Sequence, residues 1–189
     1  MTKAELRKEY KAKRLAIDGR ERLRLDDLLL LQFQQISLDG IRTVLTYWPA
    51  THLAEPNMHL INGYLRHTIP DLQLCFTVMQ QETNTLIPSL IDENTVYHTV
   101  SMGITEPKEI VPIDPHEMDL VLVPMLVCDQ VGYRVGYGKG YYDRFLSTCR
   151  EDVVRLGLGY FEPIERIQDT HRFDVPLTHY LTPSEFYEF

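Results

Sequence analysis

The segment MDLVLVPML, residues 118–126, constrains the fold of this chain more than any other. Its apolar side chains do not alternate with polar ones, so both faces of an extended strand would be hydrophobic here. Strands of that kind belong to parallel sheets that helices cover on both sides. The segment therefore predicts an α/β domain in which 118–126 is a fully buried strand.

Other strands and helices are expected to alternate around this segment, as an α/β domain requires. Runs of β-branched and aromatic residues predict strands, and helix-forming residues predict helices. The expected strands are 43–48, 72–79, 95–100 at an edge, 153–160 and, as the last, 179–182; the expected helices are 2–17, 20–35, 58–67 and 142–150. With 189 residues, 44% of them hydrophobic, the whole chain is predicted to form one domain, with a mostly parallel sheet and helices on both faces.

Charge is distributed unevenly along the chain. Residues 1–24 contain nine Lys or Arg and four Asp or Glu, a net charge of +5, which leaves −13 for the rest of a chain whose total is −8. The total argues against a nucleic-acid-binding protein, whereas the basic N-terminal helix suits either an anionic ligand or a solvated surface. No apolar run is long enough for a membrane-spanning helix, and three scattered cysteines argue against a disulfide framework. We expect a cytoplasmic monomer.

The stretch GYRVGYGKGYYDRFL, residues 132–146, is the strongest candidate for a ligand site. Gly136, Gly138 and Gly140 alternate just before an expected helix, which allows backbone N–H groups to face an anion. Lys139 adds a full positive charge. The stretch therefore predicts a phosphate cradle, with a plain glycine-rich turn as the alternative.

The spacing of this stretch matches neither GxxxxGK[ST] nor GxGxxG, so the common nucleotide motifs do not identify the ligand. Asp143 falls in the first turn of the expected helix. It is either an ordinary acid at a helix N-terminus or a ligand for Mg²⁺ beside bound phosphates. The residues alone leave both interpretations open.

The same stretch resembles the signature of the 5-formyltetrahydrofolate cyclo-ligase family, whose members are also called methenyltetrahydrofolate synthetases. Five further segments resemble family motifs, in the family's order and over nearly the whole chain. They are KAELR (3–7), TYWPATHLAEPNMHLI (46–61), MGITEP (102–107), DLVLVPMLVCD (119–129) and FDVPLTHYLTP (173–183). The fold implied by this resemblance is similar to that of sugar-phosphate isomerases and CoA transferases.

The resemblance implies an enzyme that uses ATP and Mg²⁺ to cyclise 5-formyltetrahydrofolate, with or without a polyglutamate tail. In the implied mechanism the formyl oxygen attacks the γ-phosphorus and displaces ADP, which gives an iminium phosphate. N10 of the folate then attacks the formyl carbon, phosphate leaves, and 5,10-methenyltetrahydrofolate forms. Such a reaction needs alignment and neutralisation of charge and no side-chain nucleophile.

The resemblance also implies roles for individual residues of this chain. Lys3 and Arg7, which share one helical face, occupy positions that grip the ATP phosphates. Glu55 occupies the position of an acid that contacts the folate, and Asp143 and Asp174 occupy those of two Mg²⁺ ligands. The implied ATP loop comprises Arg134, Val135, Gly136, Tyr137, Gly138, Lys139, Gly140, Tyr141 and Tyr142.

Within that loop, Lys139 and Arg134 are expected to be the catalytic residues, because they would neutralise charge in the transition state. Part of the loop is also expected to face the folate, and Tyr137 is a candidate for stacking on the pterin. Trp48 is a second candidate. The equal alternative for Trp48 is a place in the core at the end of strand 43–48.

The sequence departs from the family pattern at five positions. Pro56 stands where a small aliphatic residue is usual, Met125 where glycine is usual, Cys128 where phenylalanine is usual, Phe173 where histidine is usual and Thr178 where an acid is common. These departures support an alternative hypothesis, a folate- or nucleotide-binding module without catalysis. A third hypothesis is an enzyme that resembles the sugar-phosphate isomerases or CoA transferases.

Overall fold

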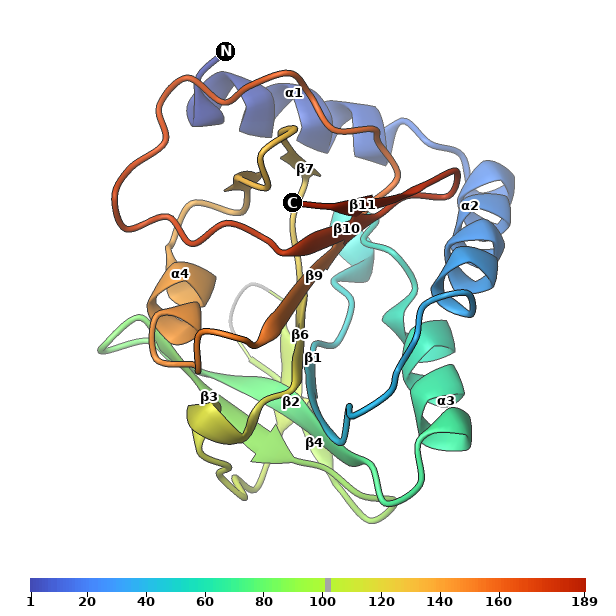
Figure 1. The fold of residues 1–189 in the computed structure, drawn as a ribbon, viewed down its shortest axis with the longest axis vertical. Coiled ribbons are helices and arrows are strands. Elements are labelled where there is room, and N and C mark those ends of the chain that lie inside the picture. Colours follow the sequence, from blue (N-terminus) through green and yellow to red (C-terminus); the bar gives the residue numbers. More distant parts are fainter. Residues whose placement is uncertain (101–102) are drawn as a thin grey trace.

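The computed structural model describes residues 1–100 and 103–189, whose centre is a seven-stranded sheet in the order β11-β10-β9-β6-β1-β2-β3 (Figure 1). Its strands are β1 (Thr43–Thr46), β2 (Gln73–Gln80), β3 (Thr85–Leu90), β6 (Leu120–Val123), β9 (Val154–Leu158), β10 (His179–Leu181) and β11 (Phe186–Glu188). The four pairings that join β2, β1, β6, β9 and β10 are parallel. The outer pairings of β3 and β11 are antiparallel. The predicted mostly parallel sheet is confirmed.

Strand β6 is buried along its whole length, as its apolar sequence predicts. Leu120 and Leu122 pack on one face of the sheet in a cluster with α2 (Gly19–Phe33) and α3 (Met58–Thr68). Val121 and Val123 pack on the other face in a cluster with α4 (Tyr141–Leu146). Helices therefore lie on both faces, with α2 and α3 on one side in Figure 1 and α4 on the other.

Helix α1 (Lys3–Leu15) lies across the end of the sheet at which β6 leads into β7 (Val127–Cys128) (Figure 1). A capping box between Thr2 and Glu5 begins the helix. Its apolar side chains Leu6 and Tyr10 pack against the hairpin of β7 and β8 (Arg134–Val135). The basic N-terminal helix predicted from the sequence is thus anchored to the body of the protein.

Three strand predictions need correction. Segment 95–100 forms β4 (Tyr97–Thr99), which pairs with β5 (Thr105–Pro107) in a separate two-stranded sheet and not at an edge of the main one. That edge belongs to β3, which the sequence did not predict. β3 contains Pro88, which has no N–H; its carbonyl oxygen accepts from the N–H of Ile113 on the side away from β2, so the missing donor does not interrupt the pairing with β2. The strand at 179–182 is not the last, since β11 follows it.

The remaining elements are short. The 3₁₀ helices η1 (Thr51–Leu53) and η3 (Pro115–Glu117) precede α3 and β6. Helix α4 ends at Leu146, four residues before the expected end of its helix. Met102, in the segment MGITEP, lies outside the described residues. Within the two described ranges, no helix combines the length and the apolar character that a bilayer-spanning segment requires.

Leu6→Ala tests whether α1 is anchored by its apolar face. Leu6 is 1% exposed, so its truncation leaves a cavity, and we expect the free energy of unfolding to fall by about 2–4 kcal/mol. Leu15→Ala is the matched control on the same helix, because Leu15 is 50% exposed and its loss should change the free energy by less than about 0.5 kcal/mol. Chemical denaturation measures both, and equal losses would contradict the packing.

Candidate active site

The glycine-rich stretch forms the loop between β8 and α4. Gly138 and Gly140 have φ angles of +90° and +71°, which L side chains rarely adopt, and Gly140 is the N-cap of α4. Gly136 has an ordinary φ, and in the described part of the chain no atom lies within 4 Å of the position that a Cβ on it would take. Two glycines therefore shape the loop, and the third leaves its backbone open to approach.

Helix α1 places two basic side chains at this loop. Arg7 Nε donates a hydrogen bond to the carbonyl oxygen of Gly136 at 2.9 Å, and its guanidinium lies 3.1 Å from where a Cβ on Gly138 would sit. Lys3 forms an ion pair with Asp174, and its backbone N–H donates to Asp169 at 2.6 Å. Arg7 thus contacts the loop itself, whereas Lys3 contacts Asp174 and Asp169 near the other end of the chain.

A second ion pair lies beside the first. Arg134 is 8% exposed, and its guanidinium donates to Asp143 Oδ1 at 2.8 Å and to the carbonyl oxygen of Val175. Burial lowers the pKa of Arg134, while Asp143 and Asp174 oppose that shift. Because Asp174 also acts on Arg134, the two basic and the two acidic side chains form a single cluster.

The donor set of Asp143 and Asp174 fits a magnesium ion. Asp143 Oδ1 accepts hydrogen bonds from Arg134 and from the backbone N–H of Val175, and Asp174 Oδ2 accepts from Lys3 and from the N–H of His171. Within the described residues the other oxygen of each carboxylate has no hydrogen-bond donor, and the two side chains are 29% and 19% exposed. No third acid, histidine or cysteine of residues 1–100 and 103–189 completes a metal cluster with them. Mg²⁺ commonly binds one or two carboxylates together with substrate phosphates.

Glu55 lies just after η1 and contacts the loop through Tyr137. It is 8% exposed; its Oε1 accepts a hydrogen bond from the hydroxyl of Tyr137, and its Oε2 accepts from the backbone N–H of Ala50 at 2.7 Å. Burial raises the pKa of Glu55, and these hydrogen bonds and the charge of Arg14 oppose the rise. Glu55 and Tyr137, both predicted to face the folate, are therefore directly joined.

Two further tyrosines surround this carboxylate. The hydroxyl of Tyr47 is buried and has no hydrogen-bond partner among the described residues. Burial raises the pKa of Tyr47, and the nearby Glu55, Tyr137 and Tyr142 raise it further. The pKa of Tyr142 is raised by burial and then by Glu55. The region between the loop and the end of β1 is thus rich in hydroxyl groups.

The other predicted site residues differ in their surroundings. Lys139 is exposed in the loop, whereas Val135 is buried against α1 and Tyr141 packs partly on the cluster around α4. Trp48 is partly buried against the core, with its ring edge-on to His59 at 4.7 Å between centroids. A contact of Trp48 with the pterin stays a prediction.

Sequence reasoning missed Arg14, a buried arginine in the last turn of α1. It is one of nine basic residues within 1–24, and no spacing marks it as the buried one. Asp129, which ends a segment of the family resemblance, has a structural place. Its carboxylate is fully buried and accepts the backbone N–H groups of Val131, Tyr133 and Ile167, so it holds the turn before the glycine loop.

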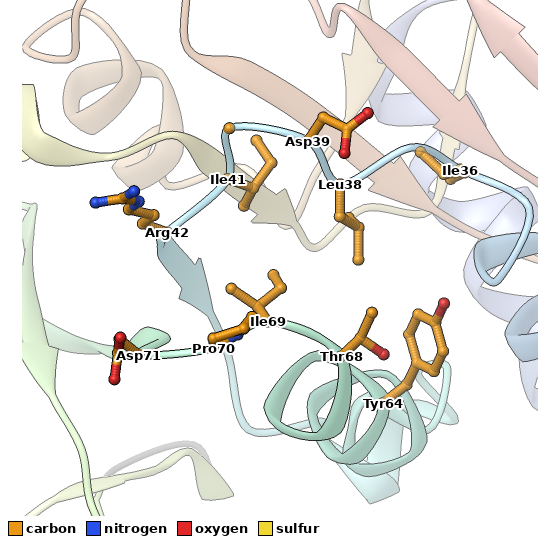
Figure 2. A pocket seen from close by; sticks show the side chains of 11 residues that line it. Ile36, Leu38, Asp39, Ile41, Arg42, Tyr64, Thr68, Ile69, Pro70 and Asp71 are labelled. Carbon is orange, nitrogen blue, oxygen red and sulfur yellow. The ribbon is translucent and has the colours of Figure 1, made fainter.

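A cleft of about 480 Å³ lies between the segment 36–42 and the end of α3 (Figure 2). The side chains of Leu38, Ile41 and Ile69 point into it, while Arg42 points away. The cleft lies at the amino end of β1, whereas the glycine loop follows the carboxyl end of β6. Ligands of open α/β sheets bind at the carboxyl ends of strands, so we place the candidate active site at the loop.

A sequence profile of the 5-formyltetrahydrofolate cyclo-ligase family matches residues 1–183. This chain belongs to that family. A 5-formyltetrahydrofolate cyclo-ligase of Mycoplasma genitalium is 33% identical over 66 residues, 34% of this chain and 40% of that protein. One of Mycoplasma pneumoniae is 23% identical over 163 residues, 85% of this chain and 86% of that protein.

The fold agrees with membership of the cyclo-ligase family. The NMR structure of Aquifex aeolicus 5,10-methenyltetrahydrofolate synthetase matches this structure with a TM-score of 0.81 and 26% sequence identity. The match covers 100% of this chain and 93% of the Aquifex chain. The resemblance read from the sequence is therefore confirmed at the level of the family and the fold, and the chain is a member of a ligase family of folate one-carbon metabolism.

Gly138→Ala tests the shape of the loop. We expect it to destabilise the protein by about 1–2 kcal/mol, because its φ is positive and the new methyl group would displace Arg7. Gly136→Ala is the matched control in the same loop and should leave the Tm nearly unchanged. Thermal denaturation of both variants measures the difference, and a similar Tm for the two would contradict the loop geometry.

Proposed function

We propose that this protein cyclises 5-formyltetrahydrofolate to 5,10-methenyltetrahydrofolate, with ATP and Mg²⁺, and releases ADP and phosphate. The proposal rests on one observation above all. Basic side chains from α1 and from β8 pair with two carboxylates next to the glycine loop, and the buried Glu55 accepts a hydrogen bond from Tyr137 of the same loop. The residues that we propose to bind the triphosphate and those that we propose to bind the folate are thus adjacent.

On the phosphate side, the residues of this chain bind and neutralise charge. Lys3, Arg7 and Lys139, together with the N–H groups of the loop, would hold the triphosphate, and Asp143 and Asp174 would hold Mg²⁺. When bound, Mg²⁺ neutralises phosphate charge and polarises the transferred phosphoryl group. Arg134 is fixed by Asp143 and Val175, so its charge needs no reorganisation as the formyl oxygen attacks the γ-phosphorus.

On the folate side, Glu55 suits a proton acceptor. N10 of 5-formyltetrahydrofolate carries a proton that must leave as N10 bonds to the formyl carbon and phosphate departs. A carboxylate whose pKa is raised by burial accepts a proton more readily than a solvated one. Tyr137 orients this carboxylate through its hydroxyl, and its ring belongs to the glycine loop, so it links the two sets of residues.

Absorbance tests the activity. Purified protein with 5-formyltetrahydrofolate, ATP and Mg²⁺ should develop the near-ultraviolet band of methenyltetrahydrofolate, with one ADP and one phosphate per product. Omission of ATP or chelation of Mg²⁺ should abolish the band. Folded protein that binds both substrates without forming the band would instead support the non-catalytic binding module.

Lys139→Ala should lower turnover by on the order of 10² and leave the Tm unchanged. The side chain is exposed, so its loss creates no cavity, and the lost charge is one that the transferred phosphoryl group would need. Lys108→Ala, at an exposed position outside the site, serves as the control and should keep full activity. Full turnover of the Lys139 variant would remove Lys139 from the mechanism.

Asp143→Asn should raise the Mg²⁺ concentration needed for half-maximal turnover more than it raises the KM for folate, because the amide lacks the charge that Mg²⁺ prefers. The Tm should also fall, since the buried Arg134 loses its charged partner. Asp152→Asn is the control, because Asp152 is 78% exposed and pairs with Arg150 away from the loop. Identical Mg²⁺ titrations of the Asp143 variant and wild type would leave Asp143 as a structural partner of Arg134.

A further inference from the structure

We propose that Arg14 is a positioning residue that fixes the hydroxyl of Tyr137 and, through it, the carboxylate of Glu55. The inference rests on the proposed function, because it takes Glu55 to be the acid that faces the folate. Arg14 itself is not placed against any substrate. It would act indirectly, through the side chains of Tyr137 and Glu55.

Each of the three nitrogens of the Arg14 guanidinium donates a hydrogen bond inside the protein. The residue is 2% exposed and donates three hydrogen bonds: Nε to the carbonyl oxygen of Leu53 at 2.8 Å, one terminal nitrogen to that of Met125 at 2.9 Å, and the other to the hydroxyl oxygen of Tyr137 at 2.6 Å. Arg14 therefore joins the segment before Glu55, the chain after β6 and the glycine loop.

These contacts fix the direction of the chain of hydrogen bonds. An arginine can only donate, so the oxygen of Tyr137 must accept from Arg14. The hydroxyl proton of Tyr137 is then free to point to Glu55, whose Oε1 is its acceptor. The N–H of Ala50 takes the second oxygen. Arg14 thus holds Tyr137 as a donor and favours Glu55 as an ionised acceptor.

Stability alone gives a weak reason for this arrangement. A buried charged pair often contributes no more to stability than apolar residues of similar volume would, because removing the charges from water is costly. A fully connected polar network does restrict its members to one geometry. Positioning of Glu55 gives the buried arginine a role beyond the packing of α1 on the hairpin, to which Leu6 and Tyr10 contribute the apolar side chains.

The charge of Arg14 also bears on the ionisation of Glu55. The ionisable groups that face Glu55 come from five segments: Arg14, His52, Tyr47, Tyr137 and Tyr142. Arg14 and His52 lower the pKa of Glu55, and burial raises it. Removal of Arg14 therefore raises that pKa further. If ionised Glu55 is required, activity must then be lost at a higher pH as the pH falls.

Two substitutions of Arg14 separate charge from geometry. Arg14→Met keeps volume and loses the charge, whereas Arg14→Lys keeps the charge and loses the three-way fork. Lys13→Met is the matched control, because Lys13 is the adjacent residue on α1, is 49% exposed and pairs with Glu9 on the surface. Tyr137→Phe removes the hydroxyl through which Arg14 is proposed to act, alone and combined with Arg14→Met.

The measurement is kcat/KM for 5-formyltetrahydrofolate as a function of pH, per folded protein. We expect Arg14→Met to lower it by ~10² at neutral pH and to move the acid limb of the profile to higher pH. Arg14→Lys should lower kcat/KM by a smaller factor, and the acid limb of its pH profile should stay near that of wild type. In the Tyr137→Phe background, Arg14→Met should cost several-fold less than it does alone, because the shared hydroxyl is already gone. Lys13→Met should match wild type.

An unmoved acid limb in Arg14→Met would overturn the inference, and so would an equal loss with and without the Tyr137 hydroxyl. A merely structural arginine would give one of these two results. Equilibrium binding of 5-formyltetrahydrofolate, followed by the fluorescence of Trp48, the only tryptophan of the chain, provides a readout without catalysis. If the wild type binds folate, Arg14→Met weakens that binding and no product forms, the proposed activity is wrong and the inference about Arg14 stands. If Arg14→Met does not change folate binding, or if the wild type binds no folate, the inference is wrong.

Discussion

The packing of α1 on the β7–β8 hairpin is the contact on which the rest of the site depends. Leu6 and Tyr10 hold the helix by burial of apolar surface. Because side chains three or four residues apart share a helical face, this anchorage also fixes where the basic residues of α1 point. Arg7 thereby bonds the backbone of the loop at Gly136, and Arg14 bonds the hydroxyl of Tyr137 in the same loop. An apolar contact thus determines an electrostatic arrangement.

Four charged side chains of the site form two ion pairs. Asp174 holds Lys3, and Asp143 holds the buried Arg134. An unpaired charge in these positions would carry a large cost, since removal from water disfavours an ion without a partner. The ion pairs hold Lys3 and Arg134 in place and offset part of the free-energy cost of removing these charges from water.

The sequence predicted those parts of the fold that local patterns control. The apolar run at 118–126 predicted β6 and both of its faces, and the helix-forming composition of residues 2–17 predicted α1. The strands that it missed or misplaced depend on pairing with other segments. β3 contains a proline and pairs with β2 at the edge of the main sheet, whereas β4 pairs with β5 in a separate sheet. No local pattern encodes such partners.

The site shows the same division between local and distant information. The glycine stretch carries its own signal, because alternating glycines before a helix predict a loop with unusual backbone angles, and Gly138 and Gly140 do adopt positive φ angles. Binding of an anion by this loop stays a prediction. Arg14 carries no such signal. Eight other basic residues lie within residues 1–24, and burial of the Arg14 guanidinium is decided by Leu53, Met125 and Tyr137, which lie 39, 111 and 123 residues away.

The departures from the family pattern are accommodated without breaking the network of charged residues. Met125 packs its sulfur where a Cβ on Gly157 would lie, so the absence of a side chain at 157 makes room for it, and its carbonyl still accepts from Arg14. Thr178 bonds the backbone of β9. Phe173 is 65% exposed and stacks with His171, while the adjacent Asp174 still pairs with Lys3. The positions at which the sequence departs from the family pattern therefore leave both ion pairs of the site, Lys3–Asp174 and Arg134–Asp143, intact.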